Sequence, residues 1–296
     1  MKKSLLLALA AGLCLVNLGA AQGTRLLRQP TVSQNQVAFA YANDLWITSR
    51  DGGDARRLTS FPGAESQPRF SPDGSMVAFT GQYDGNTDVY VVPAVGGEPV
   101  RLTFHPGGDT AQGWTPDGTS VLFTSGRDSA PIPYSKFWTV PVTGGPPTKL
   151  LNSRVSEGSF SADGAYLAYQ EKEPWETEFR NYRGGQANPI WVMAMKDHSI
   201  TKLPWQGEQQ WNPVWLGDSV YFLSDKDFAM NLYRYQKGAR DVEQLTHYVE
   251  FDAKQLQAGG GVLVYEYGGY LQLFDSVSGK AQQLEIEVRG DLPWAR

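Results

Sequence analysis

The chain has 296 residues, of which 32 are glycine and 18 proline, and it contains 9 Trp, 14 Tyr and 13 Phe. Aromatic residues are common in strands, and glycine and proline in turns, so this composition favours an all-β protein over a helical one. The formal net charge of −5 argues against nucleic acid as a partner, because proteins that bind phosphates carry basic surfaces.

The first 21 residues have the pattern of a secretory signal peptide. Lys2 and Lys3 precede an apolar run at 5–18, and small residues follow at 19–21. We predict cleavage near Ala20 or Ala21 and a periplasmic or secreted protein without membrane attachment. The alternative is an uncleaved membrane anchor, for which the apolar run is short. Cys14, the single cysteine, would leave with the peptide.

The rest of the chain repeats a unit with the period of a β-propeller blade, about 40–50 residues. The turn Ser-Pro-Asp-Gly at 71–74 recurs as Thr-Pro-Asp-Gly at 115–118, as Ser-Ala-Asp-Gly at 161–164 and, less well matched, as Leu-Gly-Asp at 216–218. The first two spacings between the aspartates are 44 and 46 residues. Each turn leads into an apolar strand. Third strands are expected at 44–47, 88–91, 136–139, 189–192, 231–234 and 270–273, and fourth strands at 57–59, 101–103, 149–151, 202–204, 244–246 and 283–285.

Two sets of six strands predict a six-bladed β-propeller of four-stranded antiparallel blades. We expect it at residues 22–291, followed by the start of a linker at 292–296 to a downstream region. Blades one and six each have an outer strand of their own, at 57–59 and 283–286, so we expect neither terminus to lend a strand to the other blade. The predicted blades are about 25–65, 66–109, 110–155, 156–209, 210–252 and 253–291.

Blade four contains an insertion at 170–189 that is longer than a blade turn needs. Long loops on rigid scaffolds often carry function. Within it, Arg180 and Arg183 flank Tyr182, and a guanidinium fork can hold a carboxylate such as a peptide terminus. We therefore predict Arg180, Tyr182 and Arg183 as binding residues, and expect Arg183→Ala to weaken binding without unfolding the ring. The alternative is an exposed loop packed on the rim by Trp175 and Tyr182.

The sequence shows no arrangement typical of a catalytic site. Its three histidines, His105, His198 and His247, fall in predicted loops or turns, and no G-x-S-x-G motif occurs. We predict no catalytic residues in this chain.

A calcium loop is suggested by the spacing of Asp84, Asn86 and Asp88, but Val89 and Val95 stand where glycine and glutamate are required. We interpret these residues, and Asp225 and Asp227 at the matching turn of blade five, as turn and strand residues. The aspartates at 73, 117 and 163 recur once per blade and are interpreted as turn residues that bond nearby backbone. No metal and no cofactor is predicted.

The repeat F-S-P-D-G, apolar strand, D-[VI]-[YW], G-G, R-L-T resembles the repeats of TolB and tricorn-type propellers. Residues 179–191, with Y-R-G-G and then I-W-V, are similar to the fourth blade of the tricorn protease family, particularly its secreted bacterial members. The ending at 289–293 looks like the exit from their six-bladed propeller.

This resemblance implies the non-catalytic propeller portion of a serine peptidase. Tricorn-like proteins carry a second propeller, a PDZ domain and catalytic domains after the six-bladed ring, and their propellers are thought to gate peptides. The implied partners are peptides or downstream protease domains, and a homo-oligomer is left open.

Two other functions stay as alternatives. A periplasmic TolB-like module would bind a protein partner, but such proteins carry an α/β domain before the propeller. A self-sufficient propeller enzyme, such as a lyase or lactonase, needs clustered histidines or metal ligands, which the sequence does not show.

Overall fold

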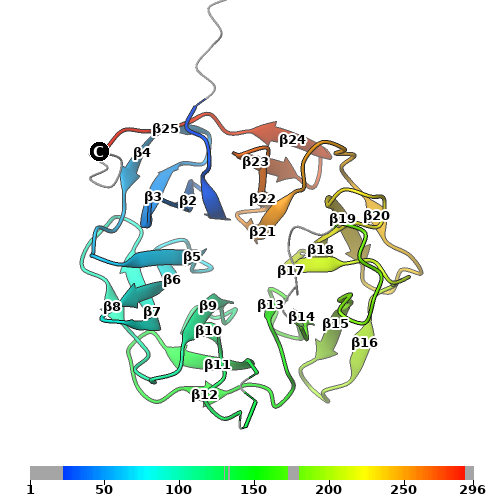
Figure 1. Ribbon diagram of the computed structural model, residues 1–296, viewed down its shortest axis with the longest axis horizontal. Helices are drawn as coiled ribbons and strands as arrows, with labels where there is room; N and C mark the ends of the chain where they lie inside the picture. Colours follow the sequence, from blue (N-terminus) through cyan, green and yellow to red (C-terminus); the bar gives the residue numbers. More distant parts are fainter. Residues whose placement is uncertain (1–22, 130, 133, 173–179, 291–296) are drawn as a thin grey trace, which may run out of the picture.

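The structure, a computed structural model, describes residues 23–129, 131–132, 134–172 and 180–290. Within these ranges every regular element is a β-strand, and the strands form six sheets arranged as blades around a common axis (Figure 1). The predicted six-bladed propeller is thus confirmed. No helix in the described ranges is long and apolar enough to span a membrane. The predicted signal peptide at 1–21 and linker at 292–296 lie outside the described residues.

The strands follow one another as antiparallel meanders from the axis outwards. In chain order they are β1 (Arg28–Val32), β2 (Gln36–Tyr41), β3 (Asp44–Ser49), β4 (Gly52–Arg57), β5 (Ala64–Phe70), β6 (Met76–Tyr83), β7 (Asn86–Pro93), β8 (Val100–Arg101), β9 (Asp109–Trp114), β10 (Ser120–Ser125), β11 (Lys136–Pro141), β12 (Thr148–Lys149), β13 (Glu157–Phe160), β14 (Tyr166–Gln170), β15 (Ile190–Ala194), β16 (Ile200–Lys202), β17 (Gln210–Leu216), β18 (Ser219–Ser224), β19 (Asn231–Gln236), β20 (Glu243–Gln244), β21 (Lys254–Gly259), β22 (Val262–Tyr267), β23 (Tyr270–Asp275), β24 (Lys280–Gln283) and β25 (Ile286–Val288).

The Asp-Gly turn between the first and second strands of a blade is fastened by its own side chains. Asp73 Oδ1 accepts hydrogen bonds from the Ser71 hydroxyl at 2.5 Å and the Ser75 amide at 3.0 Å. Gly74 has a φ of 73°, which favours glycine. Asp117 and Asp163 accept the equivalent bonds in the next two blades. These aspartates are therefore turn residues, as the sequence predicts.

The R-L-T motif fastens the end of the outer strand to the third strand. In blade one, the Leu58 amide donates to the Leu45 carbonyl at 2.7 Å, and the Thr59 hydroxyl accepts from the Leu45 amide at 3.0 Å. The same pair of bonds joins residues 102 and 103 to Val89, and residues 245 and 246 to Leu232. The motif thus satisfies backbone groups that the short outer strands leave unpaired.

The apolar core is divided into six clusters, each between two neighbouring blades. In β6, Val77 and Phe79 pack toward blade one and Ala78 packs toward blade three, and all three are fully buried. Because side chains alternate across a strand, a blade between two neighbours must be apolar on both faces. This accounts for the continuous apolar run at 76–80.

The ring closes through a shared sheet, so the expectation that neither terminus lends a strand is wrong. After β24 the chain crosses to blade one, where β25 pairs in parallel with β4, Ile286 opposite Gly53 and Val288 opposite Ala55 (Figure 1). Ile286 is buried in the cluster between blades six and one. Thr24 joins this seam, since its amide donates to the Ile286 carbonyl at 2.7 Å. The strand covers an edge that would otherwise expose unpaired backbone groups.

Candidate functional site

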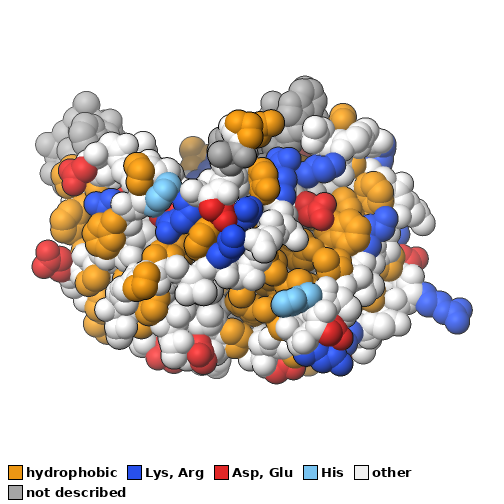
Figure 2. Space-filling view, turned by 90° about the horizontal axis from the view of Figure 1, so that it is seen from below, with side chains coloured by type: hydrophobic (Ala, Val, Ile, Leu, Met, Phe, Trp, Pro, Cys, Tyr) orange, Lys and Arg blue, Asp and Glu red, His pale blue; other side chains and the backbone are white. Residues whose placement is uncertain are grey.

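The two faces of the ring differ in the loops that they carry. In an antiparallel meander, the Asp-Gly turns lie on one face, and the loops between second and third strands lie on the other with the connections between blades. We call these the turn face and the insertion face, the second because it carries the blade-four insertion. Seen edge-on, the ring has hydrophobic, basic and acidic side chains intermixed along its side (Figure 2).

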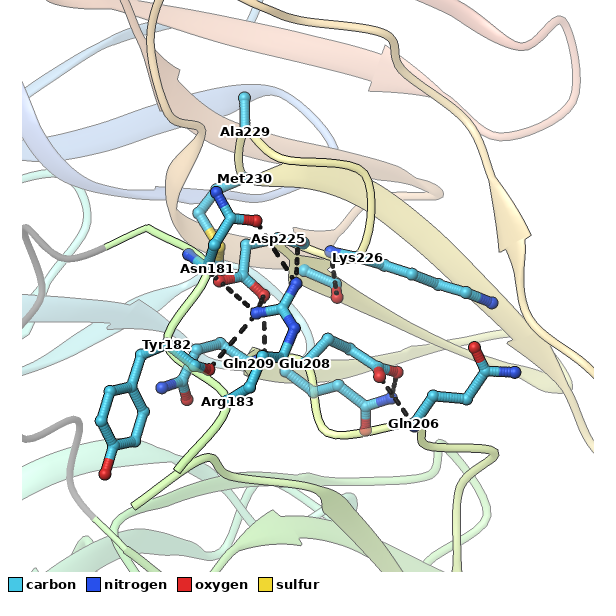
Figure 3. A network of polar contacts seen from close by, with 12 residues as sticks. Asn181, Tyr182, Arg183, Gln206, Glu208, Gln209, Asp225, Lys226, Ala229 and Met230 are labelled. Carbon is cyan, nitrogen blue, oxygen red and sulfur yellow. Dashed lines mark hydrogen bonds and ion pairs between the residues drawn. The ribbon is translucent and has the colours of Figure 1, made fainter. Parts of the chain in front are cut away.

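A buried carboxylate holds the described end of the insertion against blade five (Figure 3). Asp225, just after β18, is fully buried. Its carboxylate accepts hydrogen bonds from Arg183 Nη1 at 3.0 and 3.1 Å, the Asn181 amide at 2.8 Å and the Gln209 amide at 2.8 Å. Arg183 Nη2 also donates to the Asp225 carbonyl at 2.9 Å. The segment around Arg183 is therefore fastened to blade five by an ion pair and by backbone.

Arg180 makes a second connection, farther along blade five. Its Nε lies 2.9 Å from Asp252 Oδ1, and its Nη2 donates to the Glu250 carbonyl at 3.0 Å. Its guanidinium carbon lies 5.5 Å from the centroid of the Phe228 ring, within range of a cation–π interaction. Thus Arg180 and Arg183 lie in one segment but contact different parts of blade five.

Tyr182, between the two arginines, packs over the paired glycines that follow it. The Gln186 amide donates to its hydroxyl at 3.5 Å, and a Cβ added at Gly184 would overlap its ring. The structure therefore gives each predicted binding residue a contact within the chain, and ligand binding by Arg180, Tyr182 and Arg183 stays a prediction. Trp175, in the alternative rim-packing interpretation, lies outside the described residues.

Bulges in the inner strands place a ring of amide residues near the axis. Gln29, Gln67, Asn212 and Gln255 have φ of 52°, 53°, 51° and 56°, and each falls where the pairing of its inner strand shifts register. A bulge inserts an extra residue and re-aims its side chain. The sequence analysis missed this feature, although an amide recurs at the same place in four blades.

Two of these amides, Gln29 and Asn212, bridge the inner strands of neighbouring blades. Gln29 Oε1 accepts from the Gln67 amide at 2.9 Å, and Asn212 Nδ2 donates to Glu157 Oε2 at 2.7 Å. Arg69 donates through Nη2 to Gln67 Oε1 at 2.5 Å and through Nε to a carbonyl of blade three at 3.0 Å. Burial lowers the pKa of Arg69 to about 10, and nearby Glu157 acts in the opposite sense. Polar groups thus line the axis where one blade meets the next.

A cavity of about 270 Å³ lies at the axis on the turn-face side. Every blade contributes to its wall through an inner strand or the turn that follows. Its lining includes Val32, Phe70, Trp114, Phe160, Trp215 and Gly259. A cavity of this size accommodates side chains or a short extended segment, but no folded domain.

The other candidate residues serve the local structure. Asp88 is fully buried, pairs with Arg101 Nη2 at 2.6 Å and accepts from Thr103 Oγ1 at 3.2 Å. His105 accepts a hydrogen bond at Nδ1 from the Gly107 amide at 2.9 Å, and the three histidines belong to three different loops or turns. Among the described residues no group of three or more His, Cys, Asp or Glu could hold a metal ion.

Comparison with known proteins decides the family. Residues 24–280 match the tricorn protease N-terminal β-propeller domain. The chain belongs to this family. Tricorn protease homolog 1 of Streptomyces coelicolor is 32% identical over 269 residues, which are 89% of this chain and 25% of that protein. The tricorn propeller described here spans about a quarter of the length of the curated relatives that it matches.

Solved structures agree on the fold of this tricorn propeller. The crystal structure of the tricorn protease superposes with a TM-score of 0.80 at 22% identity, covering 90% of this chain and 27% of that one. A putative TolB from Agrobacterium tumefaciens superposes with a TM-score of 0.55 at 19% identity, covering 88% and 80%. At such identities the likeness establishes the fold alone.

Proposed function

We propose that this tricorn-type propeller is a non-catalytic module that binds peptides and guides them to or from a serine peptidase active site carried by other domains. Family membership supports a place in proteolysis. The observation that carries the proposal is the axis, where amide side chains bridge the inner strands of neighbouring blades and the turn-face ends of those strands line a narrow cavity.

The chemistry of this axis suits a peptide main chain. Every residue of a peptide except proline offers one N–H donor and one C=O acceptor, and amide side chains offer both complementary groups. Near the axis, Gln29 and Gln67 bond other described residues through Oε1, and Asn212 does so through Nδ2, so the Nε2 donors of the two glutamines and Oδ1 of Asn212 remain for a peptide. Recognition of the main chain is independent of sequence, which suits a module that handles many peptides.

The blade-four insertion is proposed as a second contact, for a peptide terminus or a neighbouring protease domain. The side chain of Arg183 is 36% exposed although it pairs with Asp225. Its bonds to other described residues, Asp225, Tyr182 and Asn181, all go through Nη1 and Nη2, so of the five N–H donors of the guanidinium the one on Nε remains for a ligand. Tyr182 and Arg180, on the same segment, would extend this contact.

Export to the periplasm or secretion is part of the proposal, on the strength of the signal-peptide pattern at 1–21. A TolB-like protein-binding role is the weaker alternative, because the family match and the 32% identical relative both point to tricorn proteases.

Photo-crosslinking tests where a peptide binds. A short peptide with a benzophenone group at its centre is irradiated with the folded chain, and labelled residues are identified by mass spectrometry. We expect labels on the inner strands β1, β5, β9, β13, β17 and β21, and loss of labelling with excess unlabelled peptide. Labels confined to the outer strands β8, β12 and β16 would contradict the proposal.

A further inference from the structure

Aromatic residues from four consecutive blades line the axial cavity. Each lies at or next to the end of an inner strand, beside the turn that follows. They are Phe70, Trp114, Phe160 and Trp215. Blades six and one contribute smaller residues to the wall, Gly259 and Val32. Flat rings therefore border the cavity on the side of blades two to five (Figure 1).

Arg69 is the single charged residue among the described residues that line this cavity. Its Nε and Nη1 donate to the carbonyls of Gln112 and Pro68 at 3.0 and 2.9 Å, and its Nη2 donates to Gln67 Oε1 at 2.5 Å. The N–H groups of a guanidinium point outward in its plane, so these bonds occupy the edge of the group. In the described chain no aromatic ring makes a cation–π contact with Arg69. The faces of its guanidinium therefore have no aromatic partner from these residues.

Burial makes Arg69 a strong partner for an aromatic ring. The residue is 6% exposed, and burial lowers its pKa to about 10, so it still carries its charge at neutral pH. The attraction between a cation and the face of an aromatic ring is larger when the cation is withdrawn from water. An aromatic ring in the cavity would gain this attraction, whereas a saturated ring of the same size would not.

The size of the cavity matches one large side chain. Its volume is about 270 Å³. A cavity of about 150 Å³ already holds a benzene ring, so there is room for the side chain of phenylalanine, tyrosine or tryptophan. Rings in the wall favour another ring, because aromatic pairs gain energy from edge-to-face and offset-stacked contacts.

We propose that the axial cavity is a subsite for one aromatic side chain of a bound peptide. The ring would lie among the four aromatic residues of the wall and stack on the guanidinium of Arg69. The peptide main chain would meet the amide side chains of the inner strands. This inference rests on the proposed function and adds to it a preference for peptides that contain phenylalanine, tyrosine or tryptophan.

The test uses the full folded chain and three unlabelled peptides with both ends blocked. They differ only at the central residue, which is phenylalanine, cyclohexylalanine or alanine, and binding is measured by isothermal titration calorimetry. We expect the phenylalanine peptide to bind at least about tenfold more tightly than the alanine peptide, through burial of the ring. It should bind about threefold more tightly than the cyclohexylalanine peptide, through the cation–π contact.

Ala162→Trp tests the position of the subsite. Ala162 lines the cavity from the blade-four turn and is exposed, so a larger side chain there leaves the core intact. Its indole would compete with the ring of the peptide, and affinity for the phenylalanine peptide should fall at least about fivefold. Ala165→Trp is the matched control. Ala165 belongs to the same turn and is exposed but does not line the cavity, so this variant should bind as the parent chain does.

Arg69→Met separates stacking on the peptide from a structural role. The bonds of Arg69 join β5 to β9, so a purely structural loss would weaken binding of all three peptides by the same factor. Loss of stacking should instead remove the preference for phenylalanine over cyclohexylalanine. Circular dichroism and the thermal midpoint establish that the variant is folded, and the two alanine variants keep the test decisive if it is not.

The outcomes distinguish the two proposals. Equal affinity for the three peptides, or unchanged affinity in Ala162→Trp, overturns the aromatic subsite and leaves peptide binding at the axis standing. Tighter binding of the cyclohexylalanine peptide than of the phenylalanine peptide by the parent chain overturns the assignment to an aromatic side chain. Binding of none of the three peptides overturns both proposals.

Discussion

Asp225 shows how one buried carboxylate can position a whole loop. Without Arg183 it would keep the hydrogen bonds from two backbone amides but lose its counter-charge. A buried charge that loses its partner is costly, so we expect Arg183→Ala to lower the free energy of unfolding by about 2–4 kcal/mol. Urea denaturation measures this loss. Ligand affinity of the variant has to be compared under conditions where it is fully folded.

Arg180→Ala is the control for the predicted effect of Arg183→Ala on the free energy of unfolding. Its pair with Asp252 lies nearer the surface, where ion pairs contribute about 1 kcal/mol or less. Adding Asp225→Asn to Arg183→Ala should recover part of the loss, because the orphaned charge is removed. Equal costs for Arg183→Ala and Arg180→Ala would show that Asp225 does not depend on its counter-charge.

At the scale of elements, β25 is the strand that closes the ring. It contributes one fully buried side chain, Ile286, to the cluster between blades six and one. Ile286→Ala should therefore lower the free energy of unfolding by about 2–4 kcal/mol. Glu285→Ala, an exposed neighbour, should stay within about 0.5 kcal/mol of the parent chain. Similar small effects of both substitutions in urea denaturation would show that the seam is held by other contacts.

At the scale of the whole molecule, the repeated Asp-Gly turns make the free energy of unfolding depend on pH in the acid range. Hydrogen bonds from Ser71 and Ser75 lower the pKa of Asp73 to about 2, and similar bonds lower the pKa of Asp117 and Asp163. A lowered folded-state pKa contributes stability above the unfolded value of 3.8, and this stability is lost as pH falls toward 2. We expect the urea midpoint to fall over this window.

Replacing the three turn aspartates by asparagine should reduce that fall without abolishing it, because hydrogen bonds also lower the pKa values of the aspartates at 128, 197, 241 and 275. Glu65 does not interfere, because burial raises its pKa, so its effect lies above its unfolded value of 4.5 and has the opposite sign. A midpoint in the parent chain that is constant from pH 4 down to pH 2.5 would contradict the prediction.

Much of the fold could be predicted from the sequence because its signals are local. The hydrogen bonds of the Asp73 turn join residues two to five apart, and the R-L-T motif acts within one blade. Such units repeat along the chain, so their count gives the number of blades. The candidate site was predicted only in part: the insertion was recognised, but Asp225 was assigned to an ordinary turn, since no local pattern links it to Arg183, 42 residues away.

The sequence by itself determined the blade, its turns and the number of its copies. Tertiary structure decided the pairing of β25 with β4 and the contacts of the insertion with blade five. The physical reason is the range of the interactions. Turn and motif hydrogen bonds are satisfied within a few residues or one blade, whereas a buried carboxylate and a strand edge acquire their partners only when separate blades pack together and the ring closes.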